Sequence, residues 1–453
     1  MKKIIEPQRE LPVLMETDVL VIGGGPAGLS AAVASGRMGV DTVLVERYGC
    51  LGGVLTQVGV ESFAWYRHEG TIDCEGIGRE FEKRAEAIGF TRPEPQSISQ
   101  AVDPEGFKYI ADCMTDEANV TTLFHSQVVD VIKEEQSLRG VIIESKSGRQ
   151  AILAKRVVDC SGDADVAARA GAPFTQRDKK DLMGVTQMFH CAGVNVDKFH
   201  KYIEEELKPT YADWGKNWSM ETTGKEDDMF SPYLEEVFSK AQEEGVIPGD
   251  ASAIAGSFST FTQSGEAIQL NVVYEPGYDC TDVLDLTRGE KWGRQQALWA
   301  IDALRHYIPG FENARLRNFG MTLGTRESRQ IVGDVRVDKD YVLNQGRCSD
   351  SIGIFPEFID GSGYLILPTT GNYYQIPFGC LKPQNVKNLL VAGRCISADV
   401  VGHTSMRNMM CCTVTGQGAG TAAALSVMEG VELDDLDINL LQKSLVEQGA
   451  RVA

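Results

Sequence analysis

The sequence predicts an α/β fold in which one discontinuous domain carries an inserted α+β domain. Three stretches, residues 18–46, 118–171 and 388–429, combine strand-like runs with glycine-rich turns, and the first and last continue into helices. Between them, residues 61–117 mix aromatic and charged side chains around a proline-rich loop, and residues 173–377 alternate strand-like runs with an acidic stretch. We therefore predict one domain assembled from separated pieces, with a second domain inserted into it.

The expected division of the chain follows these changes in composition. We assign residues 1–60, 118–173 and 378–453 to the discontinuous domain. Residues 61–117 and 174–377 are expected to form the inserted domain, which would cover the site and contact the substrate. The chain has 453 residues, which is enough for two or three domains' worth of core.

Composition and charge narrow the class of protein. Hydrophobic residues make up 43% and charged residues 24%, as in an ordinary globular enzyme. The net charge of −20 disfavours nucleic acid and anionic membranes as partners. The eleven cysteines are scattered without paired spacing, and no signal peptide is recognisable at the N-terminus. We expect a cytoplasmic protein with reduced thiols.

The first predicted strand leads into a glycine-rich turn. Residues 18–22 have the composition of a buried parallel strand, and residues 29–36 form a helix rich in small side chains. Gly23, Gly25 and Gly28 occupy the three positions of a G-x-G-x-x-G pattern. Gly23 permits the tight turn, Gly25 lets the backbone approach a pyrophosphate, and Gly28 lets helix and strand pack closely. The helix N-terminus would then offer free N–H groups and its positive dipole end to the phosphates.

An acidic residue completes this pattern. A second strand, residues 42–45, ends at Glu46, which lies 21 positions after Gly25. A carboxylate at this spacing binds the hydroxyl groups of an adenosine ribose, and it would repel the 2′-phosphate of NADP. Strand, glycines, helix, strand and acid together predict a Rossmann-like dinucleotide-binding unit. The motif by itself leaves FAD and NAD open.

Two later segments repeat the combination of a strand end and a polar glycine turn. They are residues 155–165 and residues 388–397. The second is followed by residues 402–407 and by a helix expected to open at Thr415. The glycines from Gly416 to Gly420 follow no apolar strand, so we interpret them as close helix packing and not as a second dinucleotide turn.

On these motifs, the chain resembles the FAD-dependent oxidoreductase family of the glutathione-reductase-like flavoproteins, and it is distantly similar to the flavoprotein subunit of heterodisulfide reductase. The matching stretches are residues 18–46, 51–53, 157–171, 325–333, 374–381 and 388–424. The resemblance implies that FAD is the cofactor. It also implies that the turn at Gly393 and Arg394 holds the flavin end of FAD, with the N-terminus of the last helix pointing at the isoalloxazine ring.

The same resemblance, together with the motifs, names the residues expected to contact FAD. Gly53 and Thr56 should lie along the pyrophosphate and the flavin, and Ser161 and Gly162 near the cofactor. The full expected set is Gly23, Gly25, Pro26, Ala27, Gly28, Glu46, Arg47, Gly53, Thr56, Val128, Ser161, Gly162, Gly393, Arg394 and Gly416.

Four residues are candidates for the chemistry. His403 is the leading acid or base, because imidazole titrates near neutral pH, although it is equally explained as a structural hydrogen-bonding residue. Arg407 would clamp a substrate carboxylate or neutralise the reduced flavin. Arg326, next to Glu327, would bind substrate or belong to an internal ion-pair network. Tyr374 would donate a hydrogen bond to substrate or pack in the core.

Other chemistries lack the required patterns. The six histidines show no metal-ligand spacing, so we predict no metal. The chain has no C-x₂-C-x₂-C pattern for an iron–sulfur cluster and no C-x₄-C pair, so a two-nucleotide disulfide reductase is disfavoured. Cys50 lies close to the predicted flavin site, but free cysteines are usually small buried hydrophobic residues. Trp214 and Trp218, four residues apart, would form one packed helical face or wall a substrate pocket.

Three functions remain open. The first is an oxidoreductase that passes a hydride between flavin N5 and a small organic substrate, by dehydrogenation next to a hydroxyl or amine or by reduction of an activated C=C bond. The second is an electron-transfer flavoprotein subunit that works with an iron–sulfur partner protein. The third is a binding protein in which FAD has no redox role. The electron donor or acceptor is unknown, and a homodimer is the default expectation.

Overall fold

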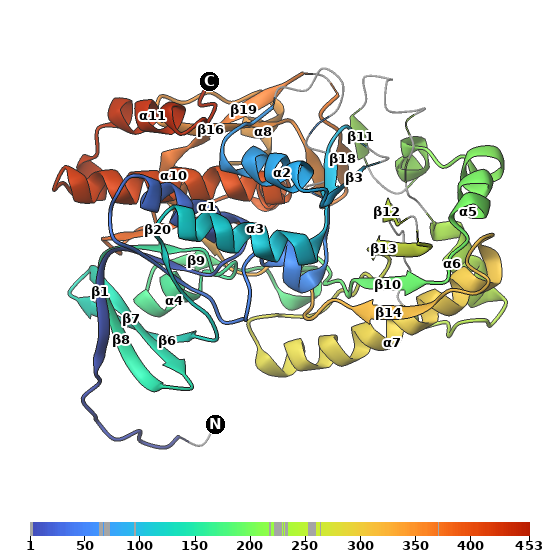
Figure 1. Ribbon diagram of the computed structural model, residues 1–453, viewed down its shortest axis with the longest axis horizontal. Helices are drawn as coiled ribbons and strands as arrows, with labels where there is room; N and C mark the ends of the chain where they lie inside the picture. The colour runs from blue at the N-terminus through green and yellow to red at the C-terminus, as the bar shows by residue number, and fades with distance from the viewer. Residues whose placement is uncertain are drawn as a thin grey trace.

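The computed structural model has two parts, each with its own hydrophobic core (Figure 1). It describes residues 3–62, 67, 73–94, 97–216, 219–221, 229, 231, 234–251, 260–262, 264–369 and 371–453. The side chains of Trp214 and Trp218 lie outside the described residues. In Figure 1 the larger part, with both ends of the chain, lies on the left, and the smaller part lies on the right along helix α7 (Val283–Tyr307).

A seven-stranded sheet organises the larger part. Its strands are β1 (Val13–Ile22), β2 (Thr42–Val45), β5 (Thr121–Leu123), β6 (Gln127–Glu134), β7 (Ser137–Ser145), β8 (Gly148–Asp159) and β20 (Leu389–Val391). The order is β5-β2-β1-β8-β7-β6, and the first four strands are parallel. β8 pairs with β1 along one edge. Along its other edge, its first half pairs antiparallel with β7 and residues 157–159 pair parallel with β20. The predicted Rossmann-like α/β fold is confirmed.

Two helices in contact lie on one face of this sheet. They are α1 (Pro26–Arg37) and α10 (Met409–Met428). α10 is buried from residue 409 to residue 426, as expected for a helix that is apolar on all sides. A Cβ added at Gly416 would lie 2.0 Å from the carbonyl oxygen of Ala27, and one at Gly420 would lie 2.1 Å from that of Ala31. The predicted role of these glycines in close helix packing is confirmed, although the helix begins at Met409 and not at Thr415.

Residues 61–117, which we expected in the inserted domain, contribute helices to the larger part instead. α2 (Ile77–Ala87) and α3 (Pro104–Glu117) pack on α1, and α2 also contacts α10. Phe81 and Phe107 meet edge to face, with 5.2 Å between their ring centroids, inside the core of the large sheet. The physical reason is that both helices are amphipathic, and their apolar faces complete the cover over α1.

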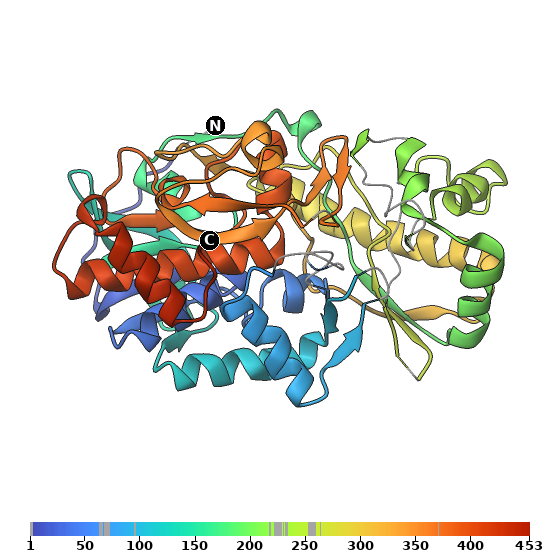
Figure 2. The same ribbon diagram turned by 90° about the horizontal axis from the view of Figure 1, so that it is seen from above.

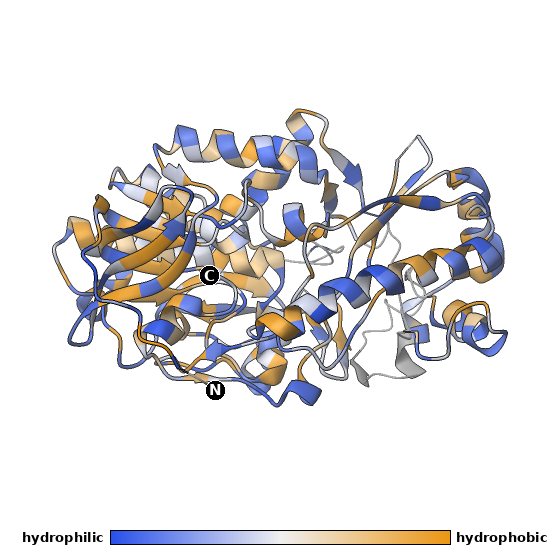
Figure 3. Ribbon diagram, turned by 90° about the horizontal axis from the view of Figure 1, so that it is seen from below, coloured by the Kyte–Doolittle hydropathy of each residue, from blue (hydrophilic) through white to orange (hydrophobic). Residues whose placement is uncertain are grey.

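The smaller part has a four-stranded antiparallel sheet in the order β12-β13-β10-β14. Its strands are β10 (Phe189–Ala192), β12 (Thr260–Phe261), β13 (Glu266–Leu270) and β14 (Arg315–Phe319). Its helices are α5 (Val196–Tyr202), α6 (Glu235–Glu243) and α7, which lies against β14 and α6. Figure 2 shows α7 running beneath this part, away from the C-terminal helices. In Figure 3 the large sheet is mostly hydrophobic, whereas α7 carries both polar and apolar residues.

Residues 330–377 return to the larger part, although we expected them in the inserted domain. A Cβ at Gly418 would lie 2.6 Å from Ile352, so β16 packs directly on α10. The side chains of Ile354 and Tyr374 belong to the same core. Around this core lie the short elements β3 (Thr91–Pro93), β4 (Gln100–Val102), β9 (Phe174–Thr175), β11 (Ser219–Glu221), β15 (Gln330–Ile331), β16 (Ser351–Pro356), β17 (Ile359–Gly361), β18 (Tyr364–Ile366), β19 (Tyr373–Pro377), α4 (Asp165–Ala170), α8 (Lys339–Leu343), α9 (Val400–Met406) and α11 (Ile438–Glu447). Single turns complete the chain at η1 (Val54–Val58), η2 (Lys179–Asp181), η3 (Ile203–Leu207), η4 (Tyr211–Lys216), η5 (Phe378–Leu381) and η6 (Leu433–Asp435).

All eleven cysteines are free thiols. Within the described part of the chain, no helix has both the length and the apolar character needed to cross a membrane.

Candidate functional site

A cavity of about 370 Å³ lies where the two parts meet, within the size range of small-molecule and cofactor sites. Its walls come from the carboxyl ends of β1, β2, β8 and β20, which is where open parallel sheets bind ligands. The starts of α1 and α10 and the turn η1 also line it. The smaller part contributes Gln269 from β13, Asn271 directly after β13, and residues 322–326 after β14.

The first glycine turn has the geometry that its sequence predicts. Gly23 has a φ of +97°, a conformation that favours glycine. A Cβ at Gly28 would lie 1.7 Å from the carbonyl oxygen of Gly23, so helix and strand touch there through backbone. Gly25 is the N-cap of α1, and Pro26 occupies its first turn. A Cβ at Gly53 would lie 2.6 Å from the Cα of Gly25, so only glycine at position 53 permits this close approach of the two backbones, and both glycines line the cavity beside the start of α1.

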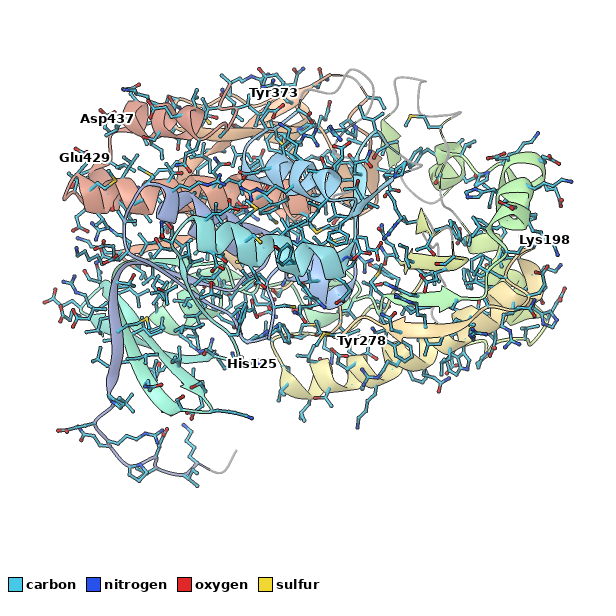
Figure 4. All side chains as sticks on the ribbon, viewed as in Figure 1. His125, Lys198, Tyr278, Tyr373, Glu429 and Asp437 are labelled. Carbon is cyan, nitrogen blue, oxygen red and sulfur yellow. The ribbon has the colours of Figure 1, made fainter. Side chains whose placement is uncertain are left out.

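Glu46 faces the cavity at the end of β2, with its side chain held by backbone groups. The N–H of Gly24 donates to Oε2 of Glu46 at 2.6 Å, and the N–H of Tyr48 donates to Oε1 at 2.9 Å. These bonds leave acceptor capacity on both oxygens for ribose hydroxyl groups. The N–H of His125, labelled in Figure 4, donates to the carbonyl oxygen of Tyr48 and ties this turn to the end of β5.

The two later glycine turns meet across the cavity through an ion pair. Arg394 Nη2 donates to Oδ1 of Asp163 at 2.7 Å, and Ser328 Oγ donates to the same oxygen at 2.6 Å. Burial raises the pKa of Asp163, but Arg394 and Ser328 outweigh it and hold the pKa below its usual value. The carboxylate therefore stays ionised, and the Arg394 guanidinium has a fixed partner.

Most of the residues expected to contact FAD line this one cavity. They are Gly23, Gly25, Pro26, Ala27, Glu46, Arg47, Gly53, Val128, Ser161, Gly162, Gly393 and Arg394. Gly28, Thr56 and Gly416 are not among the lining residues, so their contact with FAD stays a prediction. Gly28 and Gly416 instead pack closely against neighbouring backbone. The side chain of Thr56 donates from Oγ1 to the carbonyl oxygen of Leu51 at 2.6 Å.

The four candidates for the chemistry separate into two pairs. Arg326 and Arg407 line the cavity, whereas His403 and Tyr374 do not. His403 is 2% exposed, and its Nε2 lies 3.0 Å from the backbone carbonyl oxygen of Arg326, to which it donates. Burial, with a further contribution from Arg407, lowers the pKa of His403 to about 4. A neutral, buried imidazole in this position holds the backbone that carries Arg326, which differs from the expected proton-transfer role.

Tyr374 is fully buried and belongs to the core. Its hydroxyl group lies 2.9 Å from Oγ of Ser405, and its ring meets Phe355 edge to face. The packing alternative given for Tyr374 therefore fits its position, and the expected contact with substrate does not.

Sequence reasoning missed several polar residues of the cavity, among them Asp163, Asp360 and Asn271. Asp163 directly follows the predicted Ser161–Gly162 pair, so its position in the sequence could have indicated that it lines the cavity. Asp360 lies in β17 and Asn271 directly follows β13, and neither belongs to a recognisable motif. Only the approach of these distant segments brings their side chains to the cavity.

Thiol chemistry has little support from the cavity. Cys50 is not a lining residue, and its Sγ accepts a hydrogen bond from Nε2 of Gln57 at 2.7 Å. Cys412 does line the cavity, but burial raises its pKa to about 12, so the thiol is protonated and a poor nucleophile. Among the described residues, no three His, Cys, Asp or Glu side chains are grouped in a way that would hold a metal ion.

Comparisons with known proteins agree with this geometry. A 43-residue stretch is 60% identical to dihydrolipoyl dehydrogenase of Buchnera aphidicola, covering 10% of this chain and 9% of that protein. Over 189 residues the chain is 27% identical to digeranylgeranylglycerophospholipid reductase 2 of Methanothermobacter thermautotrophicus, covering 40% of this chain and 49% of that one. The chain thus spans about a tenth and about half of the length of these two relatives.

A solved structure resembles the whole chain in fold. It is a geranylgeranyl bacteriochlorophyll reductase-like protein of Thermoplasma acidophilum, with a TM-score of 0.51 and 13% identity. The match covers 97% of this chain and 85% of that chain. Residues 18–445 match the sequence model of one protein family, FAD dependent oxidoreductase. The chain therefore belongs to the FAD dependent oxidoreductase family, is an enzyme of that class, and has FAD as its cofactor.

Proposed function

We propose that this enzyme transfers a hydride between N5 of its flavin and a small organic substrate. The observation that carries the proposal is the continuity of one cavity. Its lining includes both Glu46, which is suited to a ribose, and the side chains of Arg326 and Arg407. A site with only a structural FAD would not need these two arginines.

The residues of the larger part bind and orient the cofactor. When bound, FAD supplies the hydride donor or acceptor at N5 of its isoalloxazine ring. The N-terminus of α1 and the facing glycines Gly25 and Gly53 hold the pyrophosphate, and Glu46 binds the ribose. Arg394, whose Nη2 donates to Asp163, would hold the flavin end. α10 begins at Met409, which lines the cavity, so its positive dipole end favours negative charge at that end.

The residues of the smaller part bind the substrate. Thr322 and Thr325 offer hydroxyl groups to the cavity, and Asn271 and Gln269 offer amides. The side-chain oxygen Oε1 of Gln269 is buried and has no hydrogen-bond partner among the described residues, so it is an acceptor ready for a ligand donor. Phe358 and Met409 add apolar walls that exclude water.

The test is anaerobic reduction of the FAD-loaded protein by small alcohols and amines. The visible flavin band should bleach, and a substrate deuterated at the carbon next to its hydroxyl or amine should bleach it more slowly. For the reverse direction, chemically reduced protein should be reoxidised by a compound with an activated C=C bond. In deuterated water, where the hydrogen on N5 of the reduced flavin is exchanged for deuterium, deuterium should then pass from N5 to the carbon of the substrate.

The alternative is an electron-transfer subunit that works with an iron–sulfur partner protein. Under that alternative, no carbon compound would bleach the flavin, but a reduced iron–sulfur protein would. Bleaching by carbon compounds without any isotope effect would also contradict direct hydride transfer.

A further inference from the structure

Two arginines reach the same end of the cavity from different parts of the molecule. Arg326 follows β14 on the segment that comes from the smaller part, and Arg407 directly follows α9 in the larger part. Both side chains line the cavity. His403 links their backbones: its Nε2 donates to the carbonyl oxygen of Arg326 at 3.0 Å, and its own carbonyl oxygen accepts from the N–H of Arg407 at 2.9 Å. The charge of Arg407 also lowers the pKa of Arg326, so two cations line the same region of the cavity.

The partners of Arg326 are all neutral. Nη1 donates to the carbonyl oxygen of Gly184 at 2.8 Å, and Nη2 donates to Oδ1 of Asn271 at 3.2 Å. The guanidinium also lies over the ring of Tyr274, 5.2 Å from its centroid. Burial, and then the charge of Arg407, lower the pKa of Arg326 to about 10. Arg326 therefore has its geometry fixed while its charge lacks a direct carboxylate partner.

Arg407 has one carboxylate partner and one unused donor. Its Nη2 donates to the backbone oxygen of Asp360 at 2.7 Å and lies 3.4 Å from Oδ2 of the same residue. Its Nε is buried and has no hydrogen-bond partner within the described part of the chain. A buried N–H without a partner is costly, and it is a typical feature of a site that awaits a ligand.

Neighbouring carboxylates do not supply the missing charge, because they are bound elsewhere. Glu327 pairs with Arg177 and also accepts from the N–H of Met183 at 2.9 Å. Asp163 is bound by Arg394. Among the described residues, these two guanidinium groups thus share one carboxylate that is not bound by another arginine, that of Asp360, which leaves one positive charge to be neutralised by a ligand.

We propose that the substrate carries a carboxylate, which Arg326 and Arg407 bind together. The excess of one positive charge matches one carboxylate, and guanidinium groups bind carboxylates with paired, charge-assisted hydrogen bonds. The FAD phosphates are expected at the start of α1, where Gly25 and Gly53 face each other, and we assign these two arginines to the substrate instead. This inference deepens the proposed function and rests on it for the identity of the ligand as substrate.

The experiment measures binding to the oxidised, FAD-loaded protein without turnover. Acetate is titrated, and its neutral analogue acetamide is titrated in parallel at constant ionic strength. Binding is followed by the change in the flavin spectrum and by calorimetry. Acetate should bind and acetamide should bind at least tenfold more weakly. In Arg326→Gln and in Arg407→Gln, acetate binding should weaken at least tenfold, the lower range for a lost charge-assisted hydrogen bond of about 1.5 kcal/mol.

Two further variants serve as controls. Arg336 is exposed and does not line the cavity, so Arg336→Gln removes one positive charge elsewhere and should leave acetate binding unchanged. Arg407→Lys keeps the charge but loses the planar fork, and should bind acetate with an intermediate affinity. Thermal unfolding of each variant establishes that it is folded and still holds FAD.

Three results would overturn the inference. One is acetate binding that is absent or no stronger than acetamide binding, and another is acetate binding unchanged in both glutamine variants. The third is a lower flavin midpoint potential in Arg407→Gln with acetate binding unchanged, since the arginine would then serve the reduced flavin. Arginine-dependent acetate binding without bleaching by any carbon compound would instead contradict only the proposed hydride transfer.

Discussion

Arg394 and Asp163 form an ion pair across the cavity, with 2.7 Å between Nη2 and Oδ1. The two residues are far apart in the chain, and each directly follows a glycine with positive φ, Gly393 and Gly162. The pair joins the carboxyl ends of β8 and β20, which are neighbours in the sheet. Because Ser328 also bonds Asp163, the segment that carries Arg326 is tied to the same point.

Removing the carboxylate of this pair should destabilise the protein. Asp163→Asn leaves Arg394 partly buried without its countercharge, and we expect a loss of about 2 kcal/mol in the free energy of unfolding of the FAD-free protein. The double variant Asp163→Asn/Arg394→Gln should lose less than the sum of the two single variants, since no unpaired charge remains. Strictly additive losses in denaturant unfolding would show that the two side chains do not interact.

Loss of the Glu46 carboxylate should weaken FAD binding. In Glu46→Ala the ribose hydroxyl groups lose their acceptor, and the N–H of Gly24 loses its partner. We expect the dissociation constant of FAD to rise at least tenfold, because losing one charge-assisted hydrogen bond costs about 1.5 kcal/mol of binding free energy. The dissociation constant is measured by quenching of flavin fluorescence on titration. Glu16 lies exposed on β1, and Glu16→Ala is the matched control that should retain the affinity of the wild type. Equal affinities in both variants would remove Glu46 from the site.

Helix contact through glycine should make two positions sensitive to a single methyl group. Gly416→Ala and Gly420→Ala force a Cβ against the backbone of α1, and each should cost about 1–3 kcal/mol in the free energy of unfolding. Only Gly416→Ala should also weaken FAD binding, because it displaces Ala27, which lines the cavity. Gly249 is exposed, with no atom within 4 Å of an added Cβ, so Gly249→Ala should be neutral. No loss of stability in the two helix variants would mean that α1 and α10 lie further apart.

The buried position of His403 makes it a positioning residue in our interpretation. Glutamine can place a donor near the position of Nε2, so His403→Gln should keep the hydrogen bond to the carbonyl oxygen of Arg326. We expect its rate of flavin reduction to stay within about threefold of the wild type, with an unchanged pH profile, whereas loss of a general acid or base costs about 10²-fold or more. A loss of that size in a folded, FAD-loaded variant would restore the proton-transfer role.

The same histidine should make stability depend on pH. Its pKa in the folded protein is about 4, below the 6.5 of an unperturbed histidine, so the unfolded chain binds the extra proton between these two pH values. The contribution of the neutral imidazole to the free energy of unfolding is therefore complete above pH 6.5. It decreases by up to about 3 kcal/mol as the pH falls towards 4.

His403→Gln isolates this effect from other buried groups. His190, whose pKa burial lowers to about 4, acts in the same direction, and Glu61, whose pKa burial raises to about 7, acts in the opposite direction. The difference in unfolding free energy between the wild type and His403→Gln should shrink from pH 6.5 to pH 4. In the control His306→Gln, at an exposed site, no such change should appear. A constant difference for His403→Gln would mean that folding does not lower the pKa of this imidazole.

The dinucleotide half of the site was readable from local sequence because its chemistry is local. The turn from Gly23 to Gly28 places strand, phosphate cradle and helix within one short unit, and Glu46 follows at the end of the next parallel strand. Glycine positions also carry packing information, which is why Gly416 and Gly420 were correctly interpreted as a helix contact. From the motif or from the family resemblance, Gly28, Thr56 and Gly416 were also expected to contact the cofactor, but they do not line the cavity.

The substrate half could not be read in this way. Arg326 and Arg407 share one end of the cavity only because a segment after β14 meets the segment after α9, and Asp360 joins them from β17. The local sequence around His403 does not indicate whether its imidazole faces a ligand or a backbone carbonyl group. The packing of neighbouring elements places it against the carbonyl oxygen of Arg326. By itself, the sequence determined the α/β class and the cofactor, and it predicted which residues surround the dinucleotide end, because strand pairing and phosphate binding follow short-range patterns. The tertiary structure alone decided which helices cover the sheet and which charges meet at the far end of the cavity, because those contacts join residues that no local pattern connects.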